Sequence, residues 1–308
     1  MTAVALLAAG LGPILISEAP TAPAGNPVSA FRSAKPLVRS CGVNDLTDRD
    51  VDRIERQVRL EQRRQGVKVL PAAGEFGTIR VAFHVIYFDD LNGFTFAAVT
   101  QAQVDQQIQV LNDAFPNFNF VLDSTSYTND VSALFTTGGY LFHTPGSTEE
   151  RQMKLALGRD SSRYLNIYST ALTDATGGIL GYATFPWEQK SNPTLDGVVV
   201  SYDTLPGGLF PFDEGDTAVH EVGHWLGLFH TFQGGCGFRN DGVFDTPAEA
   251  APFYGCSMVQ PDTCPSKGLD PIFNFMDYSD DACLDNFTTG QVSRMNLMTL
   301  LFRSKLLQ

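Results

Sequence analysis

One stretch constrains this 308-residue chain more than any other, namely His220-Glu221-Val222-Gly223-His224-Trp225-Leu226-Gly227-Leu228-Phe229-His230. His220 and His224 lie four positions apart, so a helix places them on the same face, one turn above the other. His230 would point about 100° away from that pair if the helix continued. Gly227 allows the helix to stop and the chain to swing back, because glycine accepts a positive φ angle. The spacing therefore predicts three imidazoles around one metal ion.

The ligand set favours zinc. Three neutral imidazoles hold Zn²⁺ at about 2.0–2.1 Å and leave a fourth position for water, which is the layout of a catalytic site and not of a structural one. Glu221 stands next to the first histidine and can act as a general base toward that water. The alternative interpretation is a helix whose histidines pack in the core or face solvent.

Composition and charge limit the choice of partners. A hydrophobic content of 43% is sufficient for one or two globular domains, and the net charge of −13 argues against nucleic acid and anionic membranes as partners. The charge is uneven, because residues 31–70 contain ten Lys/Arg and six Asp/Glu. We expect this basic segment to dock electrostatically on the acidic remainder of the chain; the alternative is a solvated basic helix.

The N-terminal region predicts a secreted protein. Residues 1–16 are small and apolar and too short to span a bilayer, so we expect a signal peptide over residues 1–19, with its end as late as residue 30. No later stretch has the length and hydrophobicity of a membrane-spanning helix. We expect a propeptide over residues 20–73, a catalytic domain over residues 74–308 and a monomeric protein.

Four cysteines follow the histidine motif closely. In an oxidising compartment they predict two disulfides, and spacing alone leaves three pairings open. A second zinc site is the competing interpretation, although the chain has no Cys-x-x-Cys pair. The four are Cys236, Cys256, Cys264 and Cys283.

Residue periodicity predicts an α+β fold. The metal helix is expected to begin at Asp216 or Thr217, either of which is a good N-cap. Residues 233–271 are rich in Gly, Pro and Cys and predict irregular structure. We expect a cleft between a sheet-containing half and this irregular half, with the metal helix as its floor. The predicted strands cover residues 78–88, 117–122, 163–169, 181–185 and 197–202, and the other predicted helices cover residues 47–65, 147–157 and 288–304, with one more opening at Thr100.

Further motifs point to a known family. Asn274-Phe275-Met276-Asp277-Tyr278 has the form of a methionine turn and leads into the last cysteine, Thr231 follows the third histidine, and Asp241-Gly242-Val243-Phe244-Asp245-Thr246-Pro247 comes soon after. With these motifs, the chain resembles the pappalysin family of metzincin metalloproteases, specifically its secreted microbial members, over residues 78–302. Matrixins are the nearest rival, but they have Ser after the third histidine and lack this cysteine-rich half.

The resemblance implies a metzincin fold, with a mixed twisted sheet and backing helices in the upper half and a disulfide-held lower half that ends in a helix. It implies that Met276 forms a hydrophobic base under the zinc. Tyr278 is implied to donate a hydrogen bond to the tetrahedral intermediate; the alternative is a packed core tyrosine. The implied disulfides are Cys236–Cys264 and Cys256–Cys283.

Substrate and calcium sites are also expected. An extended substrate is expected along an edge strand that contains Gly181, Tyr182 and Ala183. Basic-specific family members have Asp immediately before the last cysteine, whereas this chain has Ala282 there and Asp281 one position earlier, so a preference for Arg or Lys at P1′ stays open. The resemblance also implies Ca²⁺ in the loop with Asp241, Asp245 and Thr246, where a solvated acidic loop is the alternative.

The fifth cysteine lies in Arg39-Ser40-Cys41-Gly42, which resembles a cysteine switch. A thiolate is a good zinc ligand and would occupy the position of the catalytic water, keeping the precursor inactive. Gly42 would let the backbone approach closely. The alternative is an incidental unpaired cysteine.

The predicted function is that of a secreted zinc endopeptidase, made as a latent precursor, with Glu221 as general base. Its expected partners are protein or peptide substrates and its own propeptide. One alternative is a catalytically inactive metal-binding or adhesion module of the same fold. Another is an inhibitory or binding role for the N-terminal segment after its release.

Overall fold

The computed structural model describes residues 38–43, 46–67, 76–89, 95–130, 143–172 and 178–307. The signal peptide expected at residues 1–19 and the domain boundary expected near residue 74 lie outside these ranges. Among the described residues, no helix combines the length and the hydrophobicity needed to cross a membrane.

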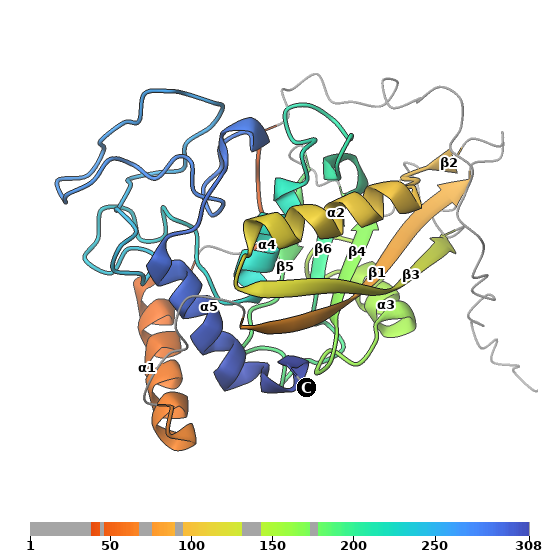
Figure 1. The fold of residues 1–308 in the computed structure, drawn as a ribbon, viewed down its shortest axis with the longest axis horizontal. Coiled ribbons are helices and arrows are strands. Elements are labelled where there is room, and N and C mark those ends of the chain that lie inside the picture. The colour runs from red at the N-terminus through yellow and green to blue at the C-terminus, as the bar shows by residue number, and fades with distance from the viewer. Residues whose placement is uncertain are drawn as a thin grey trace, which may run out of the picture.

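A mixed six-stranded sheet forms the centre of the molecule (Figure 1). Its parallel strands follow the order β3, β1, β4, β6, the short strand β2 pairs antiparallel with the end of β1, and β5 lies antiparallel to β6 at the edge. The α+β class and the mixed sheet are thus confirmed. The strands are β1 (Gly77–Asp89), β2 (Thr95–Phe96), β3 (Phe118–Asn129), β4 (Leu165–Thr170), β5 (Gly181–Ala183) and β6 (Val198–Ser201).

Helices cover both faces of this sheet. α2 and α4 pack on one face, and α3 packs on the other. α1 and α5 lie side by side next to the irregular region (Figure 1), and Met295 of α5 also packs in the main core cluster with the sheet strands. In the part of the chain that the structure describes, the α-helices are α1 (Asp48–Gln65), α2 (Gln101–Ala114), α3 (Thr148–Leu157), α4 (Asp216–Trp225) and α5 (Thr289–Phe302), and short 3₁₀ helices lie at η3 (Tyr202–Thr204), η4 (Asp281–Cys283) and η5 (Ser304–Leu307).

The core explains why α4 is held rigidly. Alternate residues of β1, such as Val81 and Phe83, pack with Val219 and Val222 of α4 in the main hydrophobic cluster. The opposite face of the same strand is also covered, because Ile86 packs in the cluster that contains Met153 of α3. Burial of both strand faces makes the sheet a fixed platform beneath the metal helix.

α4 begins at Asp216, close to the predicted start, but the predicted N-cap was wrong, because the cap is Gly215, which has a φ of 95° and provides no side-chain hydrogen bond. A tertiary contact explains the difference, since the Gln107 side chain donates a hydrogen bond to the Gly215 carbonyl. One predicted strand end was also wrong. β3 continues to Asn129 instead of ending at residue 122, because its polar second half still pairs in register with β1.

The region after α4 is irregular, as expected, and two disulfides connect its loops. They join Cys236 to Cys264 and Cys256 to Cys283, the pairing that the resemblance implies. α5 follows and is capped by Thr288 in a capping box with Gln291.

Candidate metal centre

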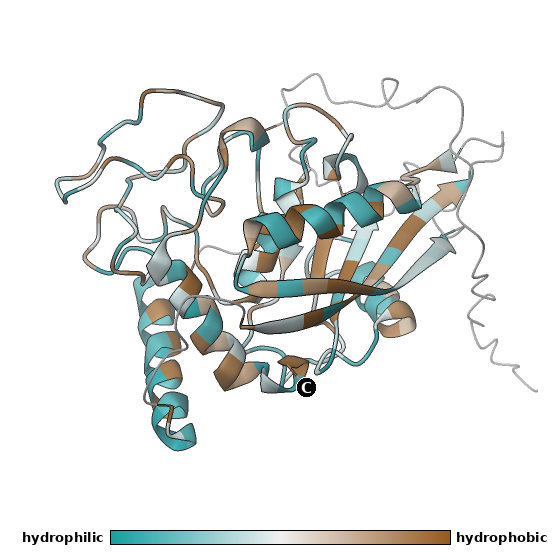
Figure 2. Cartoon of the chain, in the orientation of Figure 1, coloured by the Kyte–Doolittle hydropathy of each residue, from teal (hydrophilic) through white to brown (hydrophobic). Residues whose placement is uncertain are grey.

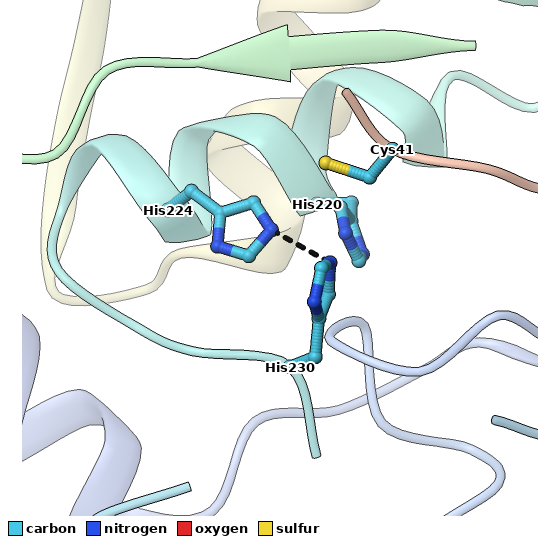
Figure 3. A group of neighbouring side chains, drawn as sticks. All are labelled: Cys41, His220, His224 and His230. Atoms are coloured by element: carbon cyan, nitrogen blue, oxygen red, sulfur yellow. Dashed lines mark hydrogen bonds between the residues drawn. The ribbon is translucent and has the colours of Figure 1, made fainter. Parts of the chain in front are cut away.

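The end of α4 brings the three motif histidines together. His220 and His224 lie one turn apart on the helix, which ends at Trp225. Gly227 has a φ of +100°, and the Leu228 amide bonds back to the Gly223 carbonyl at 2.9 Å. This reversal carries His230 to the other two rings (Figure 3).

The ring orientations fit a shared cation. Nδ1 of His220 lies 2.7 Å from the Phe275 carbonyl, and Nδ1 of His224 lies 2.8 Å from the Leu228 carbonyl, so each Nδ1 carries the proton and each Nε2 presents a lone pair. The Nε2 atoms of His224 and His230 face each other at 3.1 Å, and the buried Nε2 of His220 has no hydrogen-bond partner. Two ligands about 2.0–2.1 Å from a tetrahedral ion are separated by roughly 3.3 Å, so this donor set fits Zn²⁺.

Burial keeps these rings neutral, as metal binding requires. Burial first, and then the neighbouring histidines, lower the pKa of His220 well below its usual value. The same causes lower the pKa of His224. Neutral imidazole is the form that coordinates a metal.

Cys41 contributes the fourth potential ligand (Figure 3). Its Sγ and one nitrogen from each histidine all lie within 4.8 Å of one another. The backbone beside it pairs with the start of β5, because the Gly42 amide donates to the Gly181 carbonyl at 2.8 Å and the Leu180 amide donates to the Ser40 carbonyl at 2.9 Å. A Cβ at Gly42 would come within 2.8 Å of the Pro145 ring and 3.1 Å of the Tyr182 Cβ, so this close approach favours glycine.

Glu221 lies at the same point. Its Oε2 is 3.4 Å from the Cys41 Sγ, and its side chain contacts Gly181, where a Cβ would come within 2.8 Å of the Glu221 Cγ. Burial raises the pKa of Glu221 to about 8. The carboxylate thus occupies the space between the metal helix and the edge strand, where a general base would face both the water and the substrate.

The methionine turn supports the cluster from below. Gly223 in α4 contacts Met276, because a Cβ there would lie 2.4 Å from the Met276 Sδ. The Tyr278 hydroxyl lies 3.4 Å from Nε2 of His230 and accepts a hydrogen bond from the Cys41 amide at 3.1 Å. The structure therefore brings the turn, the third histidine and Cys41 into one site.

Asp281 binds an arginine that the sequence did not single out as a site residue. The Arg39 guanidinium forms a buried ion pair with one Asp281 oxygen, donates to the Ser279 carbonyl at 2.9 Å and lies 5.0 Å from the Phe212 ring centroid. The other Asp281 oxygen accepts from the Glu214 amide at 2.9 Å. Arg39 stands two positions before Cys41, and this spacing was the only signal in the sequence that could have identified it.

The other predicted substrate residues lie on the edge strand. Gly181 presents its backbone to the Ser40–Gly42 segment. Tyr182 points its side chain to the opposite face of the sheet, where its hydroxyl donates to the His143 carbonyl at 2.5 Å. Ala183 follows at the end of the strand.

The three predicted calcium ligands make different contacts in the structure. Asp241 is buried and accepts from the Val243 amide at 2.9 Å. The Asp245 carboxylate instead caps α5, where it accepts from the Thr288 hydroxyl at 2.8 Å and the Gly290 amide at 2.9 Å. Thr246 is buried. Glu249 was not identified from the sequence. Its side chain is fully buried, with no well-formed hydrogen bond to either oxygen.

No second group of three or more His, Cys, Asp or Glu ligand atoms comes together in the described part of the chain. The Cys41 and histidine cluster is therefore the metal centre that the described residues define most clearly.

Known metalloproteases are similar to this chain in sequence. The family described as pregnancy-associated plasma protein-A, peptidase family M43, matches residues 147–299. An extracellular metalloprotease of Pyricularia oryzae is 42% identical over 211 residues, which are 67% of this chain and 70% of the relative. An extracellular metalloprotease of Colletotrichum graminicola is 36% identical over 289 residues, which are 90% of this chain and 96% of the relative.

Solved structures are similar as well. A point mutant of Tannerella forsythia promirolysin has a TM-score of 0.68 and 29% identity, covering 87% of this chain and 97% of that one. Mature mirolysin of the same organism, in complex with a cleaved peptide, has a TM-score of 0.60 and 28% identity, covering 77% of this chain and 100% of that one.

Proposed function

Because the chain belongs to the pappalysin family of metzincin metalloproteases, we propose that it is a secreted zinc endopeptidase made as a latent precursor. The observation that supports this proposal best is the cluster of Cys41 with His220, His224 and His230, whose ligand atoms all lie within 4.8 Å. In the precursor the three imidazoles and the Cys41 thiolate would complete the coordination of one zinc ion. Removal of the cysteine would leave the fourth position to water.

The chain's own residues have distinct roles in peptide hydrolysis. Zn²⁺ bound by the three histidines supplies Lewis acidity and makes water nucleophilic near neutral pH. Glu221 accepts a proton from the attacking water and later passes it to the leaving amine. The Tyr278 hydroxyl donates a hydrogen bond to the oxyanion that develops on the scissile carbonyl. The outer backbone edge of β5 holds the substrate extended, in the way that the Gly181 carbonyl now accepts from the Gly42 amide at 2.8 Å.

The Arg39 contact supports a preference for basic substrates. Asp281 is a buried carboxylate, and its present partner is a guanidinium. Departure of the propeptide would leave this carboxylate without its counter-charge, which favours binding of an Arg or Lys side chain from a substrate. Basic-specific family members have an aspartate at the next position, which is Ala282 here. We therefore propose that Asp281 binds the basic P1′ side chain in its place.

The Cys41→Ala variant provides the test of this function. We expect the purified full-length variant to cleave a peptide library more than about tenfold faster than the intact wild-type precursor, because a lost metal–sulfur bond exceeds the 1.4 kcal/mol that corresponds to tenfold. A chelator should abolish the activity. Arg or Lys should occupy P1′, the position directly after the cleaved bond. Equal latency of both proteins would contradict the switch, and no cleavage by a fully processed chain would favour the inactive module.

A calcium ion in the loop of residues 240–249 is a separate proposal. Four buried side-chain oxygens there have no well-formed hydrogen bond, namely Asn240 Oδ1, Thr246 Oγ1 and both oxygens of Glu249. Burial, with Asp277 nearby, raises the pKa of Glu249. Oxygens in this situation suit a hard cation, and we propose that Asp241, Thr246 and Glu249 bind it, in place of the set with Asp245.

Calcium is expected to raise the unfolding temperature of the full-length protein, because a ligand at 100 times its Kd stabilises the folded state by about 2.7 kcal/mol. Glu249→Gln should remove this calcium-dependent rise. Asp245→Asn should retain it, since the Asp245 carboxylate is already engaged at the start of α5. Differential scanning calorimetry with and without calcium measures both, and an unchanged transition in the wild-type protein would contradict the proposal.

A further inference from the structure

Helix α1 rests on an apolar surface that is separate from the metal ligands. Val51, Ile54 and Val58 of α1 are almost fully buried there. Figures 1 and 2 show α1 beside α5 with its hydrophilic face turned outward. The residues that receive the helix, called the α1 seat from here on, are Phe185, Phe229, Met298 and Leu301 together with Arg239 and Arg294.

Ion pairs give the seat a charge preference. Glu55 of α1 lies 2.8 Å from Arg294, with only 17% and 9% of the two side chains exposed. Asp52 lies 2.7 Å from Arg239 at a more open position. The seat thus supplies the cations and the helix supplies the acids, which suits an amphipathic helix with a mixed apolar and acidic face.

The basic residues of α1 do not take part in this contact. Docking through the positive charge of the segment is the wrong expectation for the helix. Among the basic residues of the segment that the structure describes, Arg39 alone docks in that sense. The six arginines of α1 are exposed, namely Arg49, Arg53, Arg56, Arg59, Arg63 and Arg64.

The two attachments of the N-terminal segment are distinct. Arg39 and Cys41 reach Asp281 and the histidine cluster, whereas α1 contacts α5 and the loops around Phe185 and Phe229. Gln65 at the end of α1 donates to the Leu301 carbonyl at 2.9 Å, so the helix is held along its whole length. Loss of the metal contact would leave all of these helix contacts in place.

One residue of the seat also supports the metal turn. Arg294 donates through Nε to the Gly227 carbonyl at 2.8 Å, and its guanidinium lies 4.9 Å from the Phe229 ring centroid. Gly227 is the turn between the second and third histidines. Substitution of Arg294 would therefore disturb both places, so a test of the seat must change α1 and leave Arg294 intact.

We propose that the α1 seat is an independent docking surface for α1, which keeps the propeptide bound after the chain is cut between α1 and β1. The proposal rests on the proposed latent precursor and adds a second step to its activation. Cutting the chain alone does not release the propeptide. Displacement or digestion of α1 is also required.

The test uses the folded full-length chain with a recognition sequence for a site-specific protease inserted between Gly66 and Gly77. After cutting, size-exclusion chromatography shows whether the propeptide fragment co-elutes with the rest of the chain. We expect co-elution for the wild-type protein and for Cys41→Ala. Glu55→Arg is expected to weaken binding at least about tenfold, because it places two like charges together at a partly buried contact.

Matched variants distinguish the specific ion pairs of the α1 seat from a general effect of charge on the helix. Arg56→Glu changes an exposed position of the same helix and should leave retention unchanged. Asp52→Arg should weaken retention, and adding Arg239→Asp should restore it by reversing the ion pair. Release of the Cys41→Ala fragment immediately after cutting, or full retention of the Glu55→Arg fragment, would overturn the proposal. Because co-elution needs no activity, a chain that cleaves nothing would refute the proposed protease and leave this result interpretable.

Discussion

Glu221→Gln is expected to lower the rate of peptide-bond cleavage by the processed enzyme by about 10²–10⁴-fold, the contribution typical of a positioned general base. Glutamine has nearly the same shape as glutamate, so it preserves the packing against Gly181, but its amide does not accept a proton near neutral pH. The three histidines are unchanged, so zinc content should remain at one ion per chain. Steady-state cleavage of a short peptide and metal analysis of the same sample measure both quantities.

A glutamate far from the metal centre provides the control for the loss of one negative charge. Glu149→Gln in the first turn of α3 removes one carboxylate on the opposite face of the sheet and should leave cleavage unchanged. If Glu221→Gln cleaves within about threefold of the wild-type rate, proton transfer by this residue is not part of the mechanism, since a general base contributes far more. If the variant loses its zinc as well, Glu221 acts in metal binding.

The metal centre could be predicted because its information is local. The spacing of His220 and His224 follows from the helical repeat, and Gly227 marks the turn that returns His230. These relations span eleven residues and do not depend on the rest of the fold. Cys41 lies 180 positions from Glu221, and only its resemblance to a known motif connected it with the site.

Partners set by the tertiary fold could not be predicted. Arg39 and Asp281 are 242 positions apart, and neither has a local signal that identifies the other. The N-cap of α4 was predicted at Asp216 or Thr217 instead of Gly215 because cap preference describes isolated helices, whereas Gln107 fixes Gly215 from α2. The net charge of residues 31–70 led to the wrong docking face for α1. Net charge does not tell which face of a helix is buried, and in α1 the acidic residues Asp52 and Glu55 lie beside the buried apolar residues.

Arg303→Ala is expected to lower the free energy of unfolding by about 3–5 kcal/mol, the range for removing one partner of a buried ion pair. Arg303 and Asp196 are each 1% exposed and form two hydrogen bonds, of 2.7 and 2.8 Å. The variant would leave the Asp196 carboxylate buried with only neutral donors, the Trp225 indole at 3.1 Å and the Thr184 hydroxyl at 2.9 Å. Urea unfolding of the full-length zinc-loaded protein measures the change.

The location of this pair makes the loss relevant to the metal centre. Trp225 directly follows His224 at the end of α4, and its carbonyl accepts from Arg303 Nε at 3.1 Å. Thr184 directly follows the edge strand β5. A single carboxylate thus joins the last turn of the metal helix to the strand that would hold the substrate, and α5 supplies the counter-charge through the residue that caps its end.

An exposed ion pair provides the matched control. Arg80 pairs with Asp123 between β1 and β3, and 49% of the Arg80 side chain is exposed. Arg80→Ala should cost no more than about 1 kcal/mol, because solvent screens such a pair. If the two arginine variants lose similar stability, burial does not set the strength of the Asp196 pair; if only Arg303→Ala is severely destabilised, the junction of α4, α5 and β5 depends on this charge.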